Sequence, residues 1–378
     1  MKQIESRNWN FNESSMAYIF TIVGYFCASI ILTIVVIAVA GSLFGASQNA
    51  EEILNQSWVS YLNIFLSEFM FLLVFLICNK KCKKQLFVAS RVKVKPNIYI
   101  ILGVIFGGAV LFFGSINSSA MLNELFQNFA KPMTDIAVPI DNFAQFLLAT
   151  LMLAVLPAVC EELLFRGLIF NGLKSKLKAH WAIIFSALLF ALMHMSIYQT
   201  VHQFVLGVIL ATLAYYSGTI VYGMIFHFVN NFLVVFLTYL FPTCSFTFSS
   251  WGVWEVILSI AIFMVAIGIC ALLFYLLAKH NKKVARDTTS KNSMESRIDS
   301  TNQYKWQEII AESQQNCGLY ELSSKIEDSE NKNLEKSEIL TKKQENNSYL
   351  SHNDSTLGII LYGISAVLCV LMWVINSF

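Results

Sequence analysis

Charged residues are scarce in this sequence. Only 13% of its 378 residues are Asp, Glu, Lys or Arg, whereas 56% are hydrophobic, and the mean hydropathy is +0.60. Soluble domains carry about 25% charged residues, so this composition excludes an ordinary soluble protein. The net charge of +2 is too small to favour nucleic acid as a partner. The composition therefore predicts a multispanning membrane protein whose main partner is the lipid bilayer.

Disulfide and zinc-finger patterns are also missing. The eight cysteines are scattered, most of them lie in apolar stretches, and no pair of CxxC motifs occurs. This excludes a disulfide framework and a structural zinc site of cysteines. No cleavable signal peptide is apparent, because residues 1–16 are polar and mixed in charge and the first apolar run is too long for an h-region. We therefore interpret that run as a first membrane span.

Long apolar runs are the dominant feature of what is present. A helix needs about 20 residues to cross a bilayer. The runs that have or approach this length lie near 17–44, 58–78, 98–120, 143–165, 181–195, 201–216, 219–240, 254–278 and 356–376. The fifth and sixth are short and are joined by residues 196–200. The pattern predicts an all-α fold, a polytopic membrane helical bundle with about eight core spans plus one C-terminal span.

The loops between these runs alternate in basic charge. Lysine and arginine gather after the second, fourth and eighth runs, at residues 80–95, 174–178 and 279–286. The loop at 45–57 has no basic residue, and the loop at 241–253 has no charge. The positive-inside rule then predicts a cytoplasmic N-terminus. The many Asn, Lys and Ile residues are typical of an AT-rich genome, which favours a bacterium as the host. The predicted location is therefore the bacterial cell membrane.

Residues 280–355 differ from the rest in composition. They are rich in Ser, Asn, Lys, Glu and Gln, and they have few apolar positions. So little apolar area cannot offset the entropy of ordering the segment, so we expect a disordered cytoplasmic linker. The predicted organisation is a transmembrane bundle at 1–279, this linker, and a C-terminal transmembrane helix at 356–378.

Three ionisable side chains interrupt the run that begins near residue 143. They are Glu161, Glu162 and Arg166. Each costs about 2.5–3.5 kcal/mol in a membrane helix, so pairing or function must offset the cost. Glu162 and Arg166 are four residues apart and can pair on one helix face, while Glu161 points about 100° away. We predict a supporting ion pair between Glu162 and Arg166, and a catalytic role for Glu161.

Later apolar runs carry further polar side chains. His194 and His227 lie deep in two of these runs, and Asn231 follows His227 by four residues on the same helix face. Two histidines together with a carboxylate cluster favour a functional site over isolated core residues. Asn230 points elsewhere and is predicted to make an interhelical hydrogen bond. His202 is expected at an interface or in a loop.

These residue types can perform hydrolysis in two ways. A Glu beside a His can take a proton from water, and a second His with an Asn can stabilise the oxyanion that follows. Alternatively, Glu161, His194 and His227 could hold a zinc ion that activates water, so the cofactor is either none or zinc. Cys160 is not expected to be a nucleophile, because a thiol buried beside two carboxylates is hard to ionise.

Three short polar motifs occur in order on successive apolar runs. They are Glu161-Glu162-x-x-x-Arg166, Phe190-x-x-x-His194 and His227-x-x-x-Asn231. Together they resemble the motifs of the CPBP intramembrane proteases, the group of type II CAAX prenyl endopeptidases and bacteriocin-processing or immunity proteins. The resemblance covers about residues 141–240 and implies a helical membrane protease core.

The same resemblance assigns roles to the residues of the motifs. It implies that Glu161 and His194 activate water. It also implies that His227 and Asn231 form the oxyanion site or contribute to metal binding. Glu162, together with the arginine that follows it, would support the site.

Hypotheses of three classes remain after this reasoning. The leading one is an intramembrane endopeptidase for membrane-associated peptides or proteins, because a site within the bilayer selects substrates that are already there. An alternative in the same class is CAAX-type C-terminal processing of prenylated proteins. A transporter is disfavoured by the lack of an inverted repeat and of matching broken helices. A non-catalytic scaffold is disfavoured because it leaves Glu161 unpaired.

Overall fold

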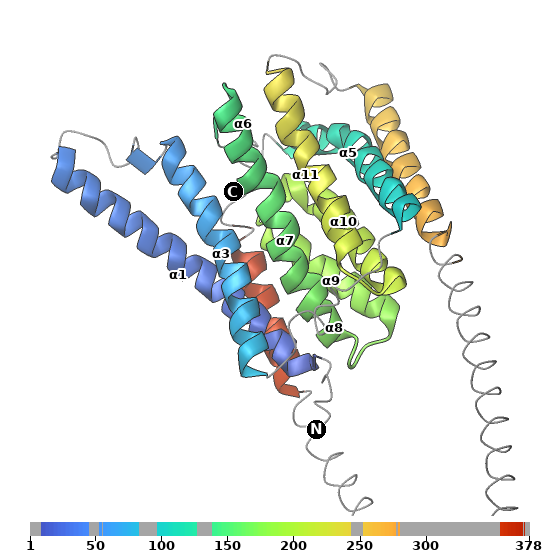
Figure 1. The fold of residues 1–378 in the computed structure, drawn as a ribbon, viewed down its shortest axis with the longest axis horizontal. Coiled ribbons are helices and arrows are strands. Elements are labelled where there is room, and N and C mark those ends of the chain that lie inside the picture. Colours follow the sequence, from blue (N-terminus) through green and yellow to red (C-terminus); the bar gives the residue numbers. More distant parts are fainter. Residues whose placement is uncertain are drawn as a thin grey trace, which may run out of the picture. The chain divides into compact units, whose positions relative to one another are not determined.

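Figure 1 shows the fold of the protein as a computed structural model. The structure describes residues 9–44, 53–54, 56–82, 97–126, 138–242, 252–276, 279, 356–372 and 374. The chain divides into two units, one formed by 1–277 together with 357–378 and the other by 278–356. The predicted linker at 280–355 lies outside the described residues. Every regular element in the described part is helical, which confirms the predicted all-α fold.

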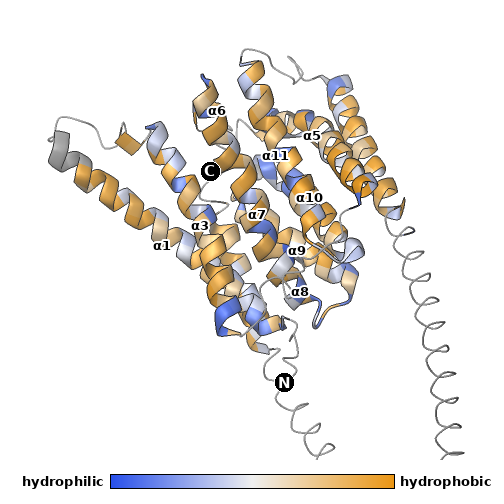
Figure 2. Cartoon of the chain, in the orientation of Figure 1, coloured by the Kyte–Doolittle hydropathy of each residue, from blue (hydrophilic) through white to orange (hydrophobic). Residues whose placement is uncertain are grey.

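Seven helices in the described part of the chain are long and apolar enough to cross a membrane. They are α1 (Phe11–Phe44), α3 (Ser57–Lys81), α5 (Ile98–Phe126), the continuous helix Phe143–Leu173, α10 (Ile197–Ser217), α11 (Val221–Leu240) and the helix Val253–Leu276. Hydrophobic residues dominate along these helices (Figure 2). The chain is therefore an integral multi-pass membrane protein, as predicted.

Two of the nine predicted spans form shorter apolar helices. They are α9 (Ala179–Met193) and the helix Thr356–Met372. At 1.5 Å per residue, the 15 residues of α9 extend only about 22 Å, less than the roughly 30 Å of a hydrocarbon core. The bundle thus combines seven full-length helices with two short ones in the described residues, where about eight spans plus one were expected.

The connection between α9 and α10 is tighter than predicted. The chain turns through residues 194–196, and residues 197–200, expected in a connecting segment, form the first turn of α10. Met195 has φ 48°, the left-handed conformation that commonly ends a helix. His194 is the C-terminal cap of α9. The turn therefore places His194 at a helix end, where its ring is not enclosed by a following helical turn.

The helix Phe143–Leu173 contains two π-helical segments. Its parts are α6 (Phe143–Thr150), η2 (Leu151–Val155), α7 (Leu156–Glu162), η3 (Leu163–Ile169) and α8 (Phe170–Leu173). Pro157 lies at the start of α7 and has no N–H, so it cannot make the α-helical bond to the carbonyl of Leu153. The π turn η2 immediately precedes it. Such turns are frequent at functional sites.

The main hydrophobic core joins side chains from most of the long helices. Its fully buried members include Phe75 on α3, Leu111 on α5, Leu164 in η3 and Phe190 on α9. The helix Thr356–Met372 contributes Tyr362 and Cys369 to the same core, and the Tyr362 hydroxyl donates a hydrogen bond to Ser14 of α1 at 2.8 Å. The C-terminal helix, predicted as a separate segment, thus packs into the bundle.

One glycine allows a close approach between α9 and α10. A Cβ at Gly207 would lie 2.9 Å from the Cα of Ala187. Any larger residue would push the two helices apart, which is the role of small residues at membrane helix interfaces. The close contact leaves the carbonyl of Gly207 within reach of the helix that carries the carboxylates.

Candidate active site

Glu162 and Arg166 form the ion pair that their spacing predicts. Arg166 Nη1 donates to Glu162 Oε1 at 2.5 Å, and both side chains are fully buried. Arg166 Nη2 donates to the carbonyl of Gly207 on α10 at 3.2 Å, and the guanidinium carbon lies 4.4 Å from the ring centroid of Phe190 on α9. Arg166 therefore connects the carboxylate helix to α9 and α10.

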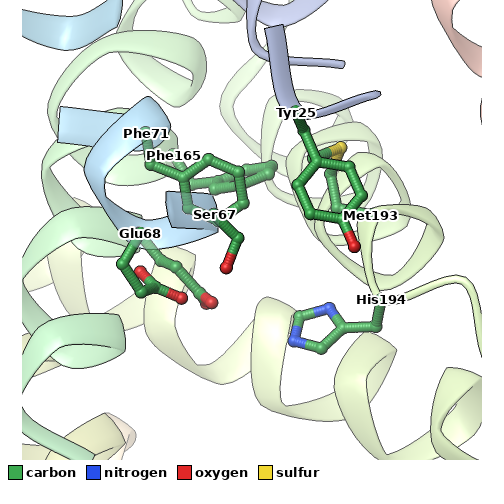
Figure 3. A pocket seen from close by; sticks show the side chains of 8 residues that line it. Tyr25, Ser67, Glu68, Phe71, Phe165, Met193 and His194 are labelled. Atoms are coloured by element: carbon green, nitrogen blue, oxygen red, sulfur yellow. The ribbon is translucent and has the colours of Figure 1, made fainter. Parts of the chain in front are cut away.

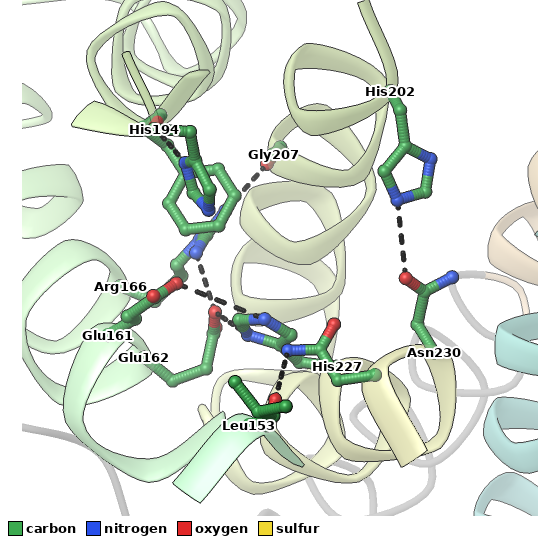
Figure 4. A network of polar contacts seen from close by, with 11 residues as sticks. Leu153, Glu161, Glu162, Arg166, His194, His202, Gly207, His227 and Asn230 are labelled. Atoms are coloured by element: carbon green, nitrogen blue, oxygen red, sulfur yellow. Dashed lines mark hydrogen bonds and ion pairs between the residues drawn. The ribbon is translucent and has the colours of Figure 1, made fainter. Parts of the chain in front are cut away.

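His227 of α11 lies between the two adjacent glutamates. Its Nε2 is 3.9 Å from Glu161 Oε2, and its Nδ1 is 3.4 Å from Glu162 Oε1, with the side chain 2% exposed (Figure 4). Gly223, one turn earlier on α11, makes room for this arrangement, because a Cβ there would lie 2.9 Å from Glu162 Oε2. Both ring nitrogens of His227 thus face carboxylate oxygens.

His194 has a defined ring orientation. Its Nδ1 is 2.9 Å from the carbonyl oxygen of Phe190, one turn earlier on α9. A carbonyl can only accept, so Nδ1 must carry the hydrogen. In the neutral imidazole Nε2 then keeps its lone pair and can accept a proton or a hydrogen bond. The helix end thereby fixes the tautomer that a base or a water-orienting group requires.

A polar cavity lies beside these residues. Its volume is about 170 Å³, which is room for several water molecules. Glu161 and His194, from different helices, both line it, together with Ser67 and Glu68 of α3 and Tyr25 of α1 (Figure 3). The structure thus brings the predicted base and the predicted histidine to the same cavity, and it adds polar groups from the first two long helices.

Glu68 is a site residue that sequence reasoning missed. It lies on α3, is 5% exposed, and lines the cavity together with Glu161. The three motifs begin only at residue 161, so none of them points to α3. The available signal was the carboxylate itself, since an ionisable residue in an apolar run is a functional candidate by default.

Asn231 contacts the backbone of the carboxylate helix. Its Nδ2 donates to the carbonyl of Leu153 at 3.2 Å. This carbonyl is the one that loses its α-helical donor because residue 157 is proline. Asn231 therefore ties α11 to the π turn before Glu161 and Glu162, and its amide retains a second N–H.

Asn230 makes the interhelical hydrogen bond predicted for it. Its Oδ1 lies 3.3 Å from His202 Nε2. His202 lies within α10, so the expectation of a loop position for this residue is wrong. The sequence places His202 at the start of the apolar run 201–216, and because α10 begins at Ile197 this residue lies in the second turn of the helix. The two residues join α10 to α11 away from the glutamates (Figure 4).

The residues predicted to hold zinc do not converge on one point. Among the described residues, no group of three His, Cys, Asp or Glu side chains is arranged to hold a metal ion. His227 directs Nδ1 toward Glu162, and His194 uses Nδ1 on a backbone carbonyl. The residues present therefore do not fit a site made by Glu161, His194 and His227.

One segment of the chain, which includes the two adjacent glutamates, matches a known protein family. Residues 143–233 match the family model described as type II CAAX prenyl endopeptidase, Rce1-like. The chain carries an Rce1-like domain. This match is consistent with the CPBP family, and it confirms the predicted resemblance. The Rce1-like domain lies within the predicted core at 141–240 and contains all four predicted catalytic residues, whereas Glu68 precedes it. No curated protein matches the sequence.

Proposed function

We propose that this protein is an intramembrane endopeptidase that hydrolyses peptide bonds of membrane-associated peptides or proteins. The observation that carries the proposal is the shared polar cavity of Glu161 and His194 inside a bundle of apolar helices. The match to the Rce1-like family supports a peptidase as the class of enzyme. A cavity among membrane helices favours substrates that already reside in or on the bilayer.

Glu161 and His194 activate the water molecule. A water molecule in the cavity transfers a proton to the carboxylate of Glu161 as its oxygen attacks the scissile carbonyl carbon. The lone pair on Nε2 of His194 accepts the second hydrogen of that water and orients it. The protonated Glu161 then returns the proton to the leaving amine, so the carboxylate is restored after each turnover.

His227 and Asn231 stabilise the oxyanion by donating hydrogen bonds to it. An N–H at Nε2 of His227, which lies 3.9 Å from Glu161 Oε2, can donate to an oxygen that develops negative charge next to the attacking water. Asn231 uses one amide N–H on Leu153 and has a second one for the same purpose. Loss of one such donor typically lowers the rate about 10²–10³-fold.

Glu162 and Arg166 support these groups without entering the reaction. Glu162 Oε1 accepts from Arg166 and also lies 3.4 Å from His227 Nδ1. This contact places the imidazole so that its other nitrogen faces Glu161. Arg166 compensates the charge of the Glu162 carboxylate and holds it in place.

The test uses purified protein in liposomes with membrane-spanning reporter peptides. Glu161→Gln should abolish cleavage while the unfolding temperature is retained, because a neutral residue is cheaper in the bilayer than a carboxylate. Glu124→Gln is the matched control, since Glu124 is an exposed residue of α5 outside the site. Cleavage by Glu161→Gln at the wild-type rate would refute the proposal.

The same preparation decides between the metal-free mechanism and the zinc alternative. If Glu161 and His194 act as an acid–base pair, a strong chelator leaves the rate unchanged. Activity that is lost on chelation, restored by zinc, and accompanied by one tightly bound zinc per chain would contradict the metal-free mechanism.

A second candidate is CAAX-type C-terminal processing of a prenylated protein. The name of the matched family favours it. A pair of peptides with the same sequence, one prenylated at its cysteine and one not, separates the two candidates. Cleavage confined to the prenylated peptide would support CAAX processing, and cleavage of unprenylated membrane peptides would support the broader endopeptidase.

A further inference from the structure

A third carboxylate belongs to the site, and it comes from outside the family segment. Glu68 of α3 is 95% buried and lines the cavity together with Glu161 and His194. Glu161 lies on α7 in a distant part of the sequence, and it lines the same cavity as Glu68. The match to the Rce1-like family covers only residues 143–233, so it assigns no role to Glu68.

A carboxylate in this position lowers the stability of the folded protein unless its interactions offset the free energy of burying it. An acidic residue in an apolar membrane helix is unfavourable to insert and to bury. Glu161 lines the same cavity, and Oε2 of Glu68 is buried without a hydrogen-bond partner. A protonated carboxyl group can donate a hydrogen bond to a neighbouring carboxylate, so a second carboxyl group in this cavity can serve as a donor to Glu161. Stability alone would be served better by an apolar residue.

Glu68 would restrain the proposed base together with His227. Glu161 faces Nε2 of His227 on α11 through Oε2, and it shares the cavity with Glu68 on α3. A carboxylate held by groups on two other helices loses little rotamer freedom when the transition state forms. Pre-organisation of this kind is what catalytic groups require from their surroundings.

We infer that Glu68 is a positioning residue, which donates a hydrogen bond to Glu161 and holds its carboxylate toward the water in the cavity. The inference rests on the proposed function. It assigns α3 a part in the active site beyond membrane anchoring, so the site spans helices from both the N-terminal part of the chain and the Rce1-like domain.

Two substitutions of similar size test the hydrogen bond. Glu68→Gln keeps a neutral donor at the same distance and should retain kcat within about threefold. Glu68→Met removes the donor and should lower kcat about 10–100-fold with little change in KM, the range for a hydrogen bond to a charged group. The unfolding temperature of Glu68→Met should stay level or rise, because the apolar side chain is cheaper in the bilayer.

Two controls separate positioning from packing. Val74→Ala truncates a buried side chain on the same helix away from the cavity, and it should lower the unfolding temperature without lowering kcat at temperatures where the protein is folded. Glu124→Gln repeats the conservative change at an exposed carboxylate. A loss of activity in both Glu68 variants that follows their loss of unfolding temperature would mean a structural role only and would overturn the inference.

The outcomes also distinguish this inference from the proposed function. Inactive Glu161→Gln together with fully active Glu68→Met would overturn the role of Glu68 and leave the peptidase proposal standing. Active Glu161→Gln would refute the peptidase proposal. A double-mutant cycle of Glu68→Met and Glu161→Met in the unfolding temperature tests the contact without any activity, and additive shifts would overturn it.

Discussion

The buried ion pair allows a prediction in which one substitution damages the protein more than two. Glu162→Met leaves Arg166 fully buried with the carbonyl of Gly207 as a remaining hydrogen-bond acceptor. Breaking a buried pair by removing one partner costs about 3–5 kcal/mol, because the other charge is left uncompensated. For a domain of 150–250 residues this corresponds to a decrease of roughly 6–20 °C in the unfolding temperature.

Replacing both partners should reverse this effect. In Glu162→Met/Arg166→Met neither charge of the pair is left, and such replacements are neutral or stabilising by about 1–4 kcal/mol. The double variant should therefore unfold at or above the wild-type temperature, yet stay inactive, because Glu162 no longer holds His227. A double variant that is as stable as wild type but inactive would show that the pair supports the site and not the fold.

The assay is thermal unfolding in detergent alongside peptide cleavage in liposomes. Glu161→Gln is the matched control for charge, because it removes a neighbouring carboxylate but leaves Arg166 paired, so its unfolding temperature should stay within a few degrees of wild type. A single variant as stable as wild type would refute the reasoning. A double variant as unstable as the single one would refute it as well.

Three further predictions follow from contacts and loops. His227→Ala should lower kcat about 10²–10³-fold through loss of an oxyanion donor, and its residual rate should resist chelation, whereas loss of bound zinc in this variant would contradict the assignment. Gly223→Ala should lower the unfolding temperature, since its Cβ would lie 2.9 Å from a Glu162 oxygen. Gly268→Ala should leave the unfolding temperature unchanged, because nothing lies within 4 Å of its Cβ. Equal effects of the two substitutions would contradict this packing account. A reporter fused after Arg286 should be cytoplasmic and one fused after Phe378 should lie on the far side, and a cytoplasmic signal from both would show that the last helix does not cross.

Local sequence features determined where the helices lie along the chain and which residues form the ion pair of the site. Apolar runs predict the positions of the bundle's helices because a backbone in lipid must satisfy its own hydrogen bonds within each helix. The pair of Glu162 and Arg166 follows from a spacing of four residues, which holds in a helix whatever its neighbours are. The order of the three motifs identifies the family for the same reason, since it needs no knowledge of packing.

Tertiary packing decided which carboxylate meets which partner. The sequence leaves Glu161 without a partner, but the packing of α3 against α7 brings Glu68 to it, and α11 places His227 between both adjacent glutamates. No periodicity relates residues on different helices, so these contacts depend on which helices are neighbours and how they are rotated.

Two backbone irregularities also escaped prediction. Asn231 shares a helix face with His227 as expected, but its partner is a backbone carbonyl beside the π turn that precedes Pro157. The turn at residues 194–196 is set by a left-handed Met195, a conformation that propensity does not predict for methionine. Periodicity assumes regular helices, whereas the geometry of this site depends on the places where two helices depart from regularity, and only the folded chain determines those departures.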